Sequence, residues 1–348
     1  VRSLGETIKD LDDQVQDCDR RQRTILLSIP NIPTASIPTG PDASGNRVVR
    51  VVGESAALDF PLRDHQELGE RLGILDLARA ARISGSGFPL LLRGGARLQR
   101  ALIQYMLDMH TRRHDYIEVM PPYVVGRDAM IGTGQLPKMT EDMYHCERDD
   151  LWLIPTAEVP LTNYFRDEII EAPLPVALTA CTPCFRREAG AAGKDTRGML
   201  RVHQFDKVEM VRFVHPDESD AQLELLVTQA EDVLKGLGLH YRVLELCSGD
   251  ISFAAARCYD IELWAPGQQG WLEVSSCSGF RDFQARRANI RFRENGKPRF
   301  VHTLNGSGVA LPRLMIAILE QGQQADATVR LPPAIVPYMD GVETLEPA

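Results

Sequence analysis

The sequence predicts an α+β protein whose core is a mainly antiparallel β-sheet flanked by helices. Strand-like segments cluster along the chain without the regular strand–helix alternation of a parallel, doubly wound sheet. Two of them, residues 182–188 and 203–212, flank a loop rich in Gly, Ala, Lys, Asp and Arg, which predicts a long hairpin. The density of proline and glycine between residues 29 and 46 separates an amphipathic N-terminal segment from the rest. We therefore expect three regions, at residues 1–27, 28–47 and 48–348.

The N-terminal segment has the periodicity of a coiled coil. Its apolar or uncharged positions alternate at intervals of four and three residues, at Leu4, Ile8, Leu11, Val15, Cys18, Gln22 and Ile25. This heptad seam and its wide polar face predict one helix of a coiled coil. We expect the partner helix to come from an N-terminal segment absent from this sequence or from another chain. The alternative is an amphipathic helix that lies on the main body. The next region, residues 28–47, carries four prolines and predicts a stiff linker without regular structure.

The body mixes strand and helix signals. Apolar residues at helical spacing, such as Leu98, Leu102 and Met106, predict a strong helix over residues 96–114. The helices that we expect in the body are 64–81, 96–114, 160–168, 217–236 and 309–321. The strands that we expect, from their β-branched and aromatic residues and the turn residues around them, are 47–52, 89–92, 116–120, 152–154, 176–181, 182–188, 203–212, 241–247, 259–264, 271–276 and 288–293.

Composition excludes several classes of protein. The 348 residues are 44% hydrophobic and 25% charged, and no apolar run approaches the length that spans a membrane. Seven scattered cysteines do not form a disulfide framework, so we expect a reducing, cytoplasmic location. A net charge of −9 argues against a generic nucleic-acid coat, although a basic run at residues 281–299 leaves a local nucleic-acid surface open.

Three familiar motifs are incomplete. Residues 190–195 look like a phosphate-binding Walker A loop, but the spacing is short and no Ser or Thr follows the lysine. His110 and His114 lack the glutamate of a zinc-protease helix, so we expect them on an exposed helix face. Cys181 and Cys184 form a lone CxxC, which predicts two reduced strand cysteines, with a zinc or redox role as the alternative.

The predicted hairpin carries the strongest functional signal. Its strand ends hold Arg186, Glu188, Arg201, Phe205 and Glu209. A basic loop between two paired strands suits a polyphosphate, because the sheet fixes the side chains and the loop closes over the ligand.

Three further stretches place polar groups at strand ends. Thr156 and Glu158 precede a helix, where the alternative role of Thr156 is an N-cap. Glu273 and Ser276 offer the oxygen ligands that Mg²⁺ prefers, although strict strand alternation puts them on opposite faces of a half-buried strand. A glycine-containing turn joins Asn305 and Ser307 to an apolar helix that begins near an arginine suited to a terminal phosphate, Arg313. Together these groups suit a nucleoside triphosphate, Mg²⁺ and a small polar substrate.

These stretches resemble class II aminoacyl-tRNA synthetases, and within that class the bacterial type of seryl-tRNA synthetase. The resemblance runs from about residue 48 to the C-terminus. Its most specific pieces are GTGQLPK (132–138), IPTAEVPLTN (154–163), CFRREAGAAGKDTRGMLRVHQFDKVE (184–209), SSCSGFRDFQARR (275–287) and TLNGSGVALPR (303–313). Residues 96–122 resemble the family's motif 1, the hairpin resembles motif 2, and residues 305–320 resemble motif 3. The resemblance implies a class II catalytic core and a homodimer through the motif 1 helix.

The resemblance also implies the role of each site residue. For ATP, Arg186 contacts the α-phosphate, Glu188 the adenine region and Arg201 the outer phosphates. Phe205 stacks on the adenine, and Arg313 covers its other face and reaches the γ-phosphate. The implied Mg²⁺ ligands are Glu273 and Ser276, and the implied catalytic residues are Arg186, Glu273 and Arg313. The implied serine-binding residues are Thr156, Glu158, Arg186, Glu209, Asn305 and Ser307.

The implied reaction joins L-serine to tRNA(Ser). Serine and ATP form seryl-adenylate and pyrophosphate, and the seryl group then moves to the 3′ end of tRNA(Ser), releasing AMP. The family carries an N-terminal coiled-coil arm that binds tRNA, and residues 1–27 resemble only the end of its second helix. We therefore expect the arm to be largely missing from this chain, and we expect residues 190–197 to meet the tRNA acceptor end. The alternatives are an armless paralogue that passes an adenylated amino acid to a carrier protein, and a non-enzymatic regulator.

Overall fold

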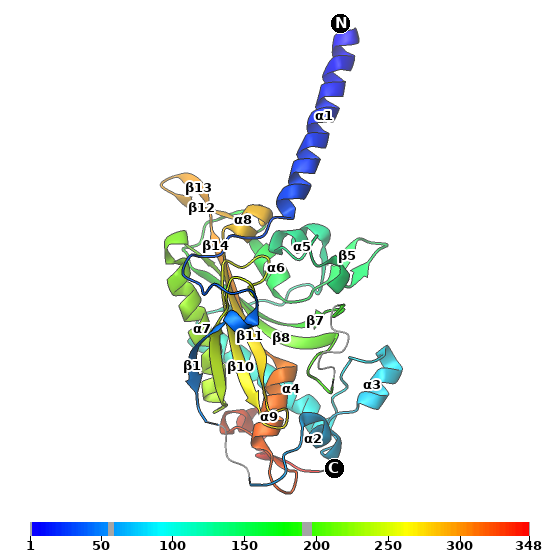
Figure 1. The fold of residues 1–348 in the computed structure, drawn as a ribbon, viewed down its shortest axis with the longest axis vertical. Helices are drawn as coiled ribbons and strands as arrows, with labels where there is room; N and C mark the ends of the chain where they lie inside the picture. The colour runs from blue at the N-terminus through cyan, green and yellow to red at the C-terminus, as the bar shows by residue number, and fades with distance from the viewer. Residues whose placement is uncertain (1, 55–58, 190–196, 348) are drawn as a thin grey trace.

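A computed structural model of the protein describes residues 2–54, 59–189 and 197–347. Its body is organised around an eight-stranded sheet, below a helix that stands away from it (Figure 1). The strand order is β1 (Arg47–Val52), β9 (Tyr241–Glu245), β10 (Arg257–Ala265), β11 (Gly270–Arg281), β14 (His302–Ala310), β8 (Gln204–Val214), β7 (Val176–Phe185) and β2 (Ile117–Glu118). Every pair is antiparallel except β2 with β7. The predicted α+β fold with a mainly antiparallel sheet is confirmed.

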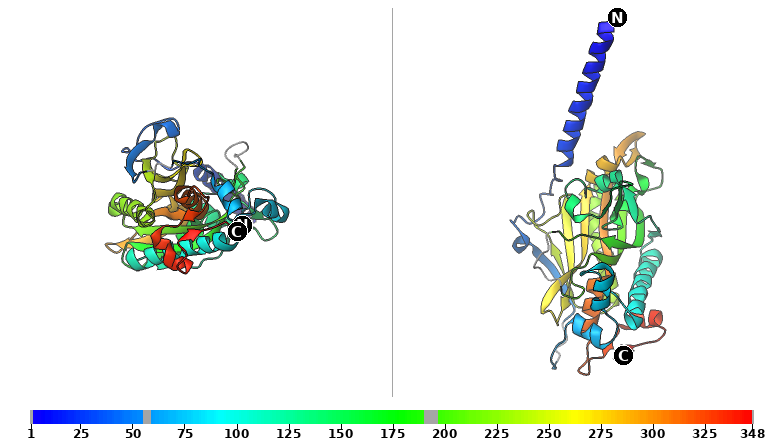
Figure 2. Two further views of the ribbon diagram at one scale, coloured as in Figure 1. Left: turned by 90° about the horizontal axis from the view of Figure 1, so that it is seen from below. Right: turned by 90° about the vertical axis from the view of Figure 1, so that its right-hand side faces the viewer.

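The N-terminal segment forms helix α1 (Arg2–Leu27), as predicted. Figures 1 and 2 show it projecting away from the body, so it is not an amphipathic helix that lies on the body. The apolar residues of its seam are exposed, with Leu4, Ile8 and Val15 between 52% and 64% accessible. Pairing of this seam with a second helix stays a prediction.

The proline-rich segment is pinned to the body rather than free. Its regular structure within residues 28–46 is one 3-10 turn, η1 (Ala43–Gly45). The backbone N–H of Asn31 donates to the carbonyl of Phe253 at 3.0 Å, and its side-chain amide donates to the carbonyls of Ala254 and Phe280, both at 2.8 Å. The end of α1 is therefore fixed to the body, whereas the proposed domain boundaries stay a prediction.

Three helices share the main apolar core with one face of the sheet. Helix α4 (Arg93–Arg113) packs on β7 and β8, α7 (Ser219–Gly236) on β11 and β14, and α9 (Leu311–Gly322) on β10 and β8. Alternation along β8 sends Val208 and Met210 into this core. The intervening side chains, including Phe205 and Lys207, face the opposite side of the sheet, where they line a cleft.

Smaller elements border that cleft and close the ends of the body. The remaining α-helices are α2 (His65–Arg71), α3 (Leu77–Ser84), α5 (Arg127–Thr133), α6 (Glu158–Thr162) and α8 (Phe283–Ala288). The small sheets are β3 (Val124–Gly126), β5 (Leu151–Leu153) and β4 (His145–Cys146); β13 (Lys297–Phe300), β12 (Arg291–Glu294) and β6 (Ile169–Ile170); and β15 (Val329–Arg330) with β16 (Thr344–Leu345). The other 3-10 helices are η2 (Thr140–Asp142), η3 (Asn163–Phe165), η4 (Pro216–Glu218) and η5 (Pro333–Met339).

Several predicted boundaries are wrong, and backbone geometry explains most of them. Residues 64–81 form two helices, α2 and α3, because Gly73 takes a positive φ of 62° and turns the chain. Residues 89–92 contribute only an isolated bridge between Leu75 and Leu91, and α4 already begins at Arg93. The helix expected at 160–168 is α6 followed by η3, and a left-handed Asn289 ends α8 before β12. The segments 176–181 and 182–188 are one strand, β7.

The histidine pair of α4 is not exposed, contrary to the prediction. His110 is fully buried against β14, and its Nδ1 lies 3.0 Å from Nδ1 of His114. The two cysteines of the CxxC are free and lie in β7, as expected. In the part of the chain that the structure describes, no helix is long and apolar enough to cross a membrane.

Candidate active site

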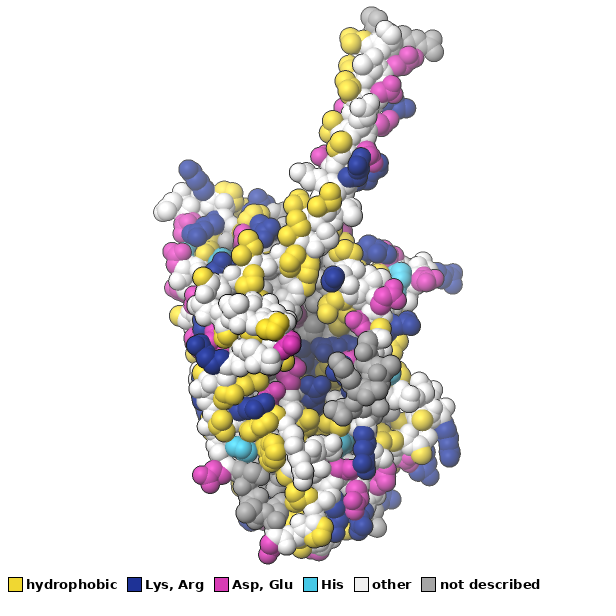
Figure 3. Space-filling view, viewed as in Figure 1, with side chains coloured by type: hydrophobic (Ala, Val, Ile, Leu, Met, Phe, Trp, Pro, Cys, Tyr) yellow, Lys and Arg dark blue, Asp and Glu magenta, His cyan; other side chains and the backbone are white. Residues whose placement is uncertain are grey.

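A cleft of about 610 Å³ opens on the face of the sheet away from the main core. Lys and Arg side chains gather where this face is hollowed (Figure 3). The predicted site residues that line it are Thr156, Glu158, Arg186, Glu188, Arg201, Phe205, Glu273, Ser276, Asn305, Ser307 and Arg313. The remaining one, Glu209, is completely buried beneath the cleft and bonded to residues that line it. The structure therefore brings together the whole predicted set.

The hairpin of β7 and β8 forms the base of the cleft. Its strands pair from Val176 with Phe213 to Phe185 with Gln204, and the backbone N–H of Arg186 extends the ladder by donating to His203 at 2.9 Å. The guanidinium of Arg186 lies 5.2 Å from the centre of the Phe205 ring, and its Nε donates to the carbonyl of Pro155 at 3.3 Å. A cation and an aromatic face thus lie together in the cleft, as a nucleotide site requires.

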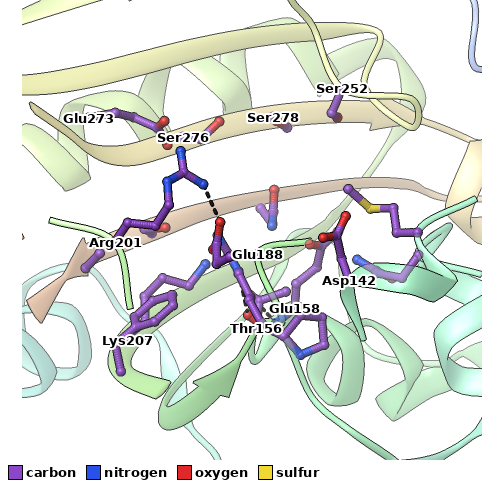
Figure 4. A pocket seen from close by; sticks show the side chains of 18 of the residues that line it. Asp142, Thr156, Glu158, Glu188, Arg201, Lys207, Ser252, Glu273, Ser276 and Ser278 are labelled. Carbon is purple, nitrogen blue, oxygen red and sulfur yellow. Dashed lines mark hydrogen bonds and ion pairs between the residues drawn. The ribbon is translucent and has the colours of Figure 1, made fainter. Parts of the chain in front are cut away.

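An ion pair crosses the open end of the hairpin. Figure 4 shows Arg201 reaching the carboxylate of Glu188 across the pocket. Glu188 has a positive φ of 52°, which turns its side chain into the cleft at the end of β7. Within the loop between the two residues, 190–196 lie outside the described residues, and this covers all of the predicted tRNA contact at 190–197 except Arg197.

A buried carboxylate organises the inner end of the cleft. The hydroxyl of Thr156 and the ammonium of Lys207 both donate to Oε2 of Glu209, each at 2.5 Å. The amide of Asn305 donates to Oε1 of the same residue at 3.4 Å. Sequence reasoning missed Lys207, although strand alternation places it on the same face as Glu209 and Phe205. The inner end therefore holds hydrogen-bond donors and acceptors in fixed positions, and these suit a ligand of the size of an amino acid.

Glu158 is a second buried carboxyl at this end. Its Oε1 accepts from the amide of Gln284 at 2.6 Å, and Gln284 in turn accepts from the hydroxyl of Thr303 at 2.7 Å. Burial and then the Glu209 carboxylate raise the pKa of Glu158, which is about 7 despite the opposing hydrogen bond from Gln284. Two buried carboxyls, those of Glu158 and Glu209, thus lie close together at the inner end of the cleft. Gln284 was not predicted, because nothing in its helical segment marks a buried side chain that supports a residue of the cleft.

The raised pKa of Glu158 predicts how stability changes with pH. Because the folded pKa exceeds the ordinary value of 4.5, the stability that this carboxyl contributes is fully present below pH 4.5 and is lost as pH rises to about 7. The loss amounts to about 3 kcal/mol. Glu158→Gln removes this pH-dependent loss. The free energy of unfolding of the variant should therefore equal that of the wild type near pH 4.5 and exceed it near pH 8. Urea unfolding at both pH values measures the difference; an equal loss in both proteins would contradict the assignment.

Glu273 and Ser276 lie on one face of β11, contrary to strict alternation. Against β10, Ser275 pairs with Ile261 and Glu273 pairs with Glu262, so Val274 is an extra residue in a β-bulge. The bulge changes the alternation by one residue, and both oxygen-bearing side chains therefore line the cleft, as Figure 4 shows.

A further carboxylate lies beside these two residues. Asp260 of β10 pairs with Ser276 across the ladder, and burial, followed by the Glu273 carboxylate, raises the pKa of Asp260 above its ordinary value. Sequence reasoning missed it because its segment is an ordinary alternating strand. Two carboxylates and a hydroxyl at close range fit a hard divalent cation. Among the described residues no group of three or more His, Cys, Asp or Glu could hold a metal.

Arg313 joins three elements at the mouth of the cleft. It lies in the first turn of α9, its Nη1 donates to the carbonyl of Glu273 at 2.6 Å, and its Nε donates to the carbonyl of Leu200 at 3.3 Å. The predicted strand–turn–helix at 303–313 is thus β14 followed by α9, and Arg313 lines the cleft together with Phe205.

Comparisons with known proteins agree with this geometry. A model of the tRNA synthetase class II core domain (G, H, P, S and T) matches residues 144–322. The chain is 57% identical to the serine–tRNA ligase of Thermomicrobium roseum and 53% identical to that of Geobacter sulfurreducens, over 99% of this chain and 78% and 82% of theirs.

Solved structures agree as well. The seryl-tRNA synthetase of Pyrococcus horikoshii, complexed with ATP, has a TM-score of 0.95 at 39% identity and covers 100% of this chain and 82% of its own. The cytoplasmic serine–tRNA ligase of Naegleria fowleri, in complex with AMP, has a TM-score of 0.91 at 29% identity, over 98% and 82% of the two chains. The predicted resemblance is confirmed: the chain belongs to the seryl-tRNA synthetase family of class II aminoacyl-tRNA synthetases.

Proposed function

We propose that this chain is a serine–tRNA ligase, which activates L-serine with ATP and transfers the seryl group to the 3′ end of tRNA(Ser). The proposal depends on one observation: residues suited to a nucleotide and residues suited to an amino acid lie at the same cleft. Arg186 and Phe205 belong to the nucleotide residues, and the amino-acid residues surround Glu209. The two sets meet at Arg186, so the carboxylate of serine and the α-phosphate of ATP lie within reach of one guanidinium.

The nucleotide part of the proposal assigns a task to each residue. Phe205 and Arg313 hold the adenine between them, Glu188 recognises its edge, and Arg201 and Arg313 bind the outer phosphates. In this arrangement the pair of Arg201 with Glu188 opens when ATP enters, because phosphate oxygens replace the carboxylate as partners of the guanidinium.

The serine part rests on the acidic inner end of the cleft. Glu158 and Glu209 bind the ammonium group, Thr156 and Ser307 complete its hydrogen bonds, and Asn305 lies beside the side-chain hydroxyl. A site that hydrogen-bonds the hydroxyl rejects alanine strongly, because alanine leaves those buried polar groups unpaired. Threonine must be rejected by the limited space instead.

The chemical step then needs positioning and electrostatic stabilisation. The serine carboxylate attacks the α-phosphorus in line, the bond to the bridging oxygen breaks, and pyrophosphate leaves. Arg186 stabilises the negative charge that grows on the α-phosphoryl oxygens. Glu273 and Ser276, with Asp260 behind them, would hold Mg²⁺, which neutralises phosphate charge when it is bound.

Glu273→Gln tests the proposed metal site. The variant keeps the shape of the side chain but removes one anionic ligand. The Mg²⁺ concentration for half-maximal serine-dependent ATP–pyrophosphate exchange should therefore rise by at least about tenfold. Titration of exchange activity with Mg²⁺ measures this. Glu262→Gln is the control for the loss of a neighbouring carboxylate, because Glu262 lies opposite Glu273 on β10 but bonds Arg242 and does not line the cleft. An unchanged Mg²⁺ requirement in Glu273→Gln would rule out its role as a ligand.

The acceptor of the activated serine separates the two candidate reactions. We propose tRNA(Ser), because the sequence retains the heptad helix α1. The experiment offers the purified chain with radiolabelled serine and ATP to tRNA(Ser) and, separately, to a carrier protein with a phosphopantetheine thiol. Label in tRNA supports the ligase, and label in the carrier alone supports the paralogue.

We further propose a cytoplasmic homodimer formed through α4 and the neighbouring strand β2. β2 is the edge of the large sheet, and the apolar side chains around it are exposed, among them Ile117 at 60% and Met120 at 89%. An unpaired apolar edge of this kind is typical of a surface that a second copy covers.

A further inference from the structure

Residues 197–205 carry Arg201 and Phe205 into the cleft. A histidine outside the cleft, His65, holds the backbone of this segment. His65 is the first residue of α2 and is completely buried. It lies between this segment and α9, far in sequence from both. It makes no contact with the cleft itself, since it is not among the residues that line it.

The hydrogen bonds of His65 define a single tautomer. The backbone N–H of Met199 donates to Nε2 of His65 at 3.0 Å. An amide N–H can only donate, so Nε2 carries no proton and the ring proton sits on Nδ1. Nδ1 lies 3.2 Å from Oε1 of Glu320 and donates to it. The ring therefore links the backbone of Met199 to a carboxylate of α9.

Glu320 is a rigid anchor for this link. It is completely buried and also accepts from the backbone N–H groups of His65 and Gly267, each at 2.9 Å. Gln268 donates to it twice more, from the backbone at 3.2 Å and from the side chain at 3.3 Å. Loss of the ring bond alone therefore leaves the carboxylate with four donors. Glu320 lies two turns along the helix that begins near Arg313.

The backbone fits closely around the ring. Gly198 has a φ of +61°, and a Cβ on it would lie 2.1 Å from Nε2 of His65. One residue earlier, Arg197 pairs with Asp64 at 2.7 Å, and Asp64 is the N-cap of α2. Three consecutive residues thus lie against the start of α2, and the next carbonyl, that of Leu200, accepts from Arg313.

We propose that His65 is a positioning residue for ATP. Its unprotonated Nε2 holds the backbone at Met199, and this sets the position of Leu200 and Arg201, and through them the alignment of Arg313 and Phe205 around the nucleotide. The inference rests on the proposed ATP-dependent function. It predicts an effect on ATP and little effect on serine, because the side chain of His65 bonds only Glu320 and Met199 among the described residues, and neither belongs to the proposed serine site.

Two substitutions test separately the two hydrogen bonds of the ring, the one that Nε2 accepts and the one that Nδ1 donates. In His65→Gln the amide oxygen can reach the position of Nε2 and accept from Met199, whereas His65→Asn can reach only the position of Nδ1 and donate to Glu320. We expect His65→Asn to raise the KM for ATP by about tenfold or more, since it leaves a buried N–H unpaired. His65→Gln should stay within about threefold of the wild type, and the KM for serine should change less than about twofold in both.

The measurement is ATP–pyrophosphate exchange, with ATP and serine varied in turn and urea unfolding recorded for each variant. The control is His240→Asn, because the ring of His240 also bonds the backbone, through Nδ1 to the carbonyl of Val52 at 3.0 Å, but does not line the cleft. Gly198→Ala supplies an independent variant that displaces the ring without altering it, and it should raise the KM for ATP as His65→Asn does.

The outcomes distinguish this inference from the proposed function. Absence of serine-dependent exchange in the wild type overturns the function and not the hydrogen-bond link. With an active wild type, equal effects of Gln and Asn, or equal rises in both KM values, would show that His65 only fills space and would overturn the inference. If His65→Asn does not fold, the KM for ATP in Gly198→Ala decides.

Discussion

Arg186→Ala is expected to lower serine-dependent ATP–pyrophosphate exchange by about a thousandfold or more. Under the proposed function Arg186 contacts both serine and the α-phosphate, and removing a preorganised donor to a developing oxyanion costs about 10²–10³ in rate even where other donors remain. Among the described residues its side chain makes one hydrogen bond, to the carbonyl of Pro155, which is long at 3.3 Å. The free energy of unfolding should therefore change little.

The neighbouring arginine provides the control for this prediction. Arg187 is not among the residues that line the cleft; its guanidinium lies 5.8 Å from the ring centre of Tyr144. Arg187→Ala should keep exchange near the wild-type rate. Sedimentation of both variants checks that the assembly state is unchanged. Exchange within tenfold of the wild type in Arg186→Ala would refute the role assigned to it.

Glu209→Gln is expected to raise the KM for serine by about a hundredfold or more. The substitution keeps the size of the side chain but removes the charge that binds Lys207 and the substrate ammonium, and truncating a buried charge pair costs about 2–5 kcal/mol. The Lys207 ammonium, only 7% exposed, then lacks its carboxylate partner, so stability should also fall. Exchange kinetics with serine varied at saturating ATP measure the effect.

Glu245→Gln separates the loss of stability from the loss of binding. Glu245 is also completely buried and pairs with Arg47 and Arg257, but it lies on β9 outside the cleft. This variant should lose comparable stability with a normal KM for serine. If the two variants change the KM equally, Glu209 acts only through folding and the assignment is wrong.

The hairpin was predicted well because the sequence features that specify it lie within the segment itself. Alternation, a glycine-rich loop and charged strand ends all fall within residues 182–212, and the structure pairs those strands with Glu209 on the side of the cleft. The helix over residues 96–114 was predicted for the same reason, since its apolar face repeats along the segment. The helix predicted at residues 64–81 is interrupted at Gly73, and the strand predicted at 89–92 is reduced to one bridge at Leu91. At both places tertiary packing determines the backbone conformation.

Other features of the site depend on partners far away in sequence. The bulge at Val274 is defined by β10, so alternation within β11 alone put Glu273 and Ser276 on the wrong relative faces. Asp260 and Gln284 lie behind the cleft, where they contact the lining residues Ser276 and Glu158, only because other strands and helices carry them there. His110 appeared to be an exposed helix residue because its burial comes from Gly308, almost two hundred residues later.

The central claim is that this cleft activates serine with ATP. The most direct test is ATP–pyrophosphate exchange by the purified chain with serine, alanine or threonine as the amino acid. The structure predicts exchange that depends on serine, falls by orders of magnitude with alanine, and is weak with threonine. Folded, intact protein that shows no serine-dependent exchange, or that exchanges equally well with alanine, would contradict the account.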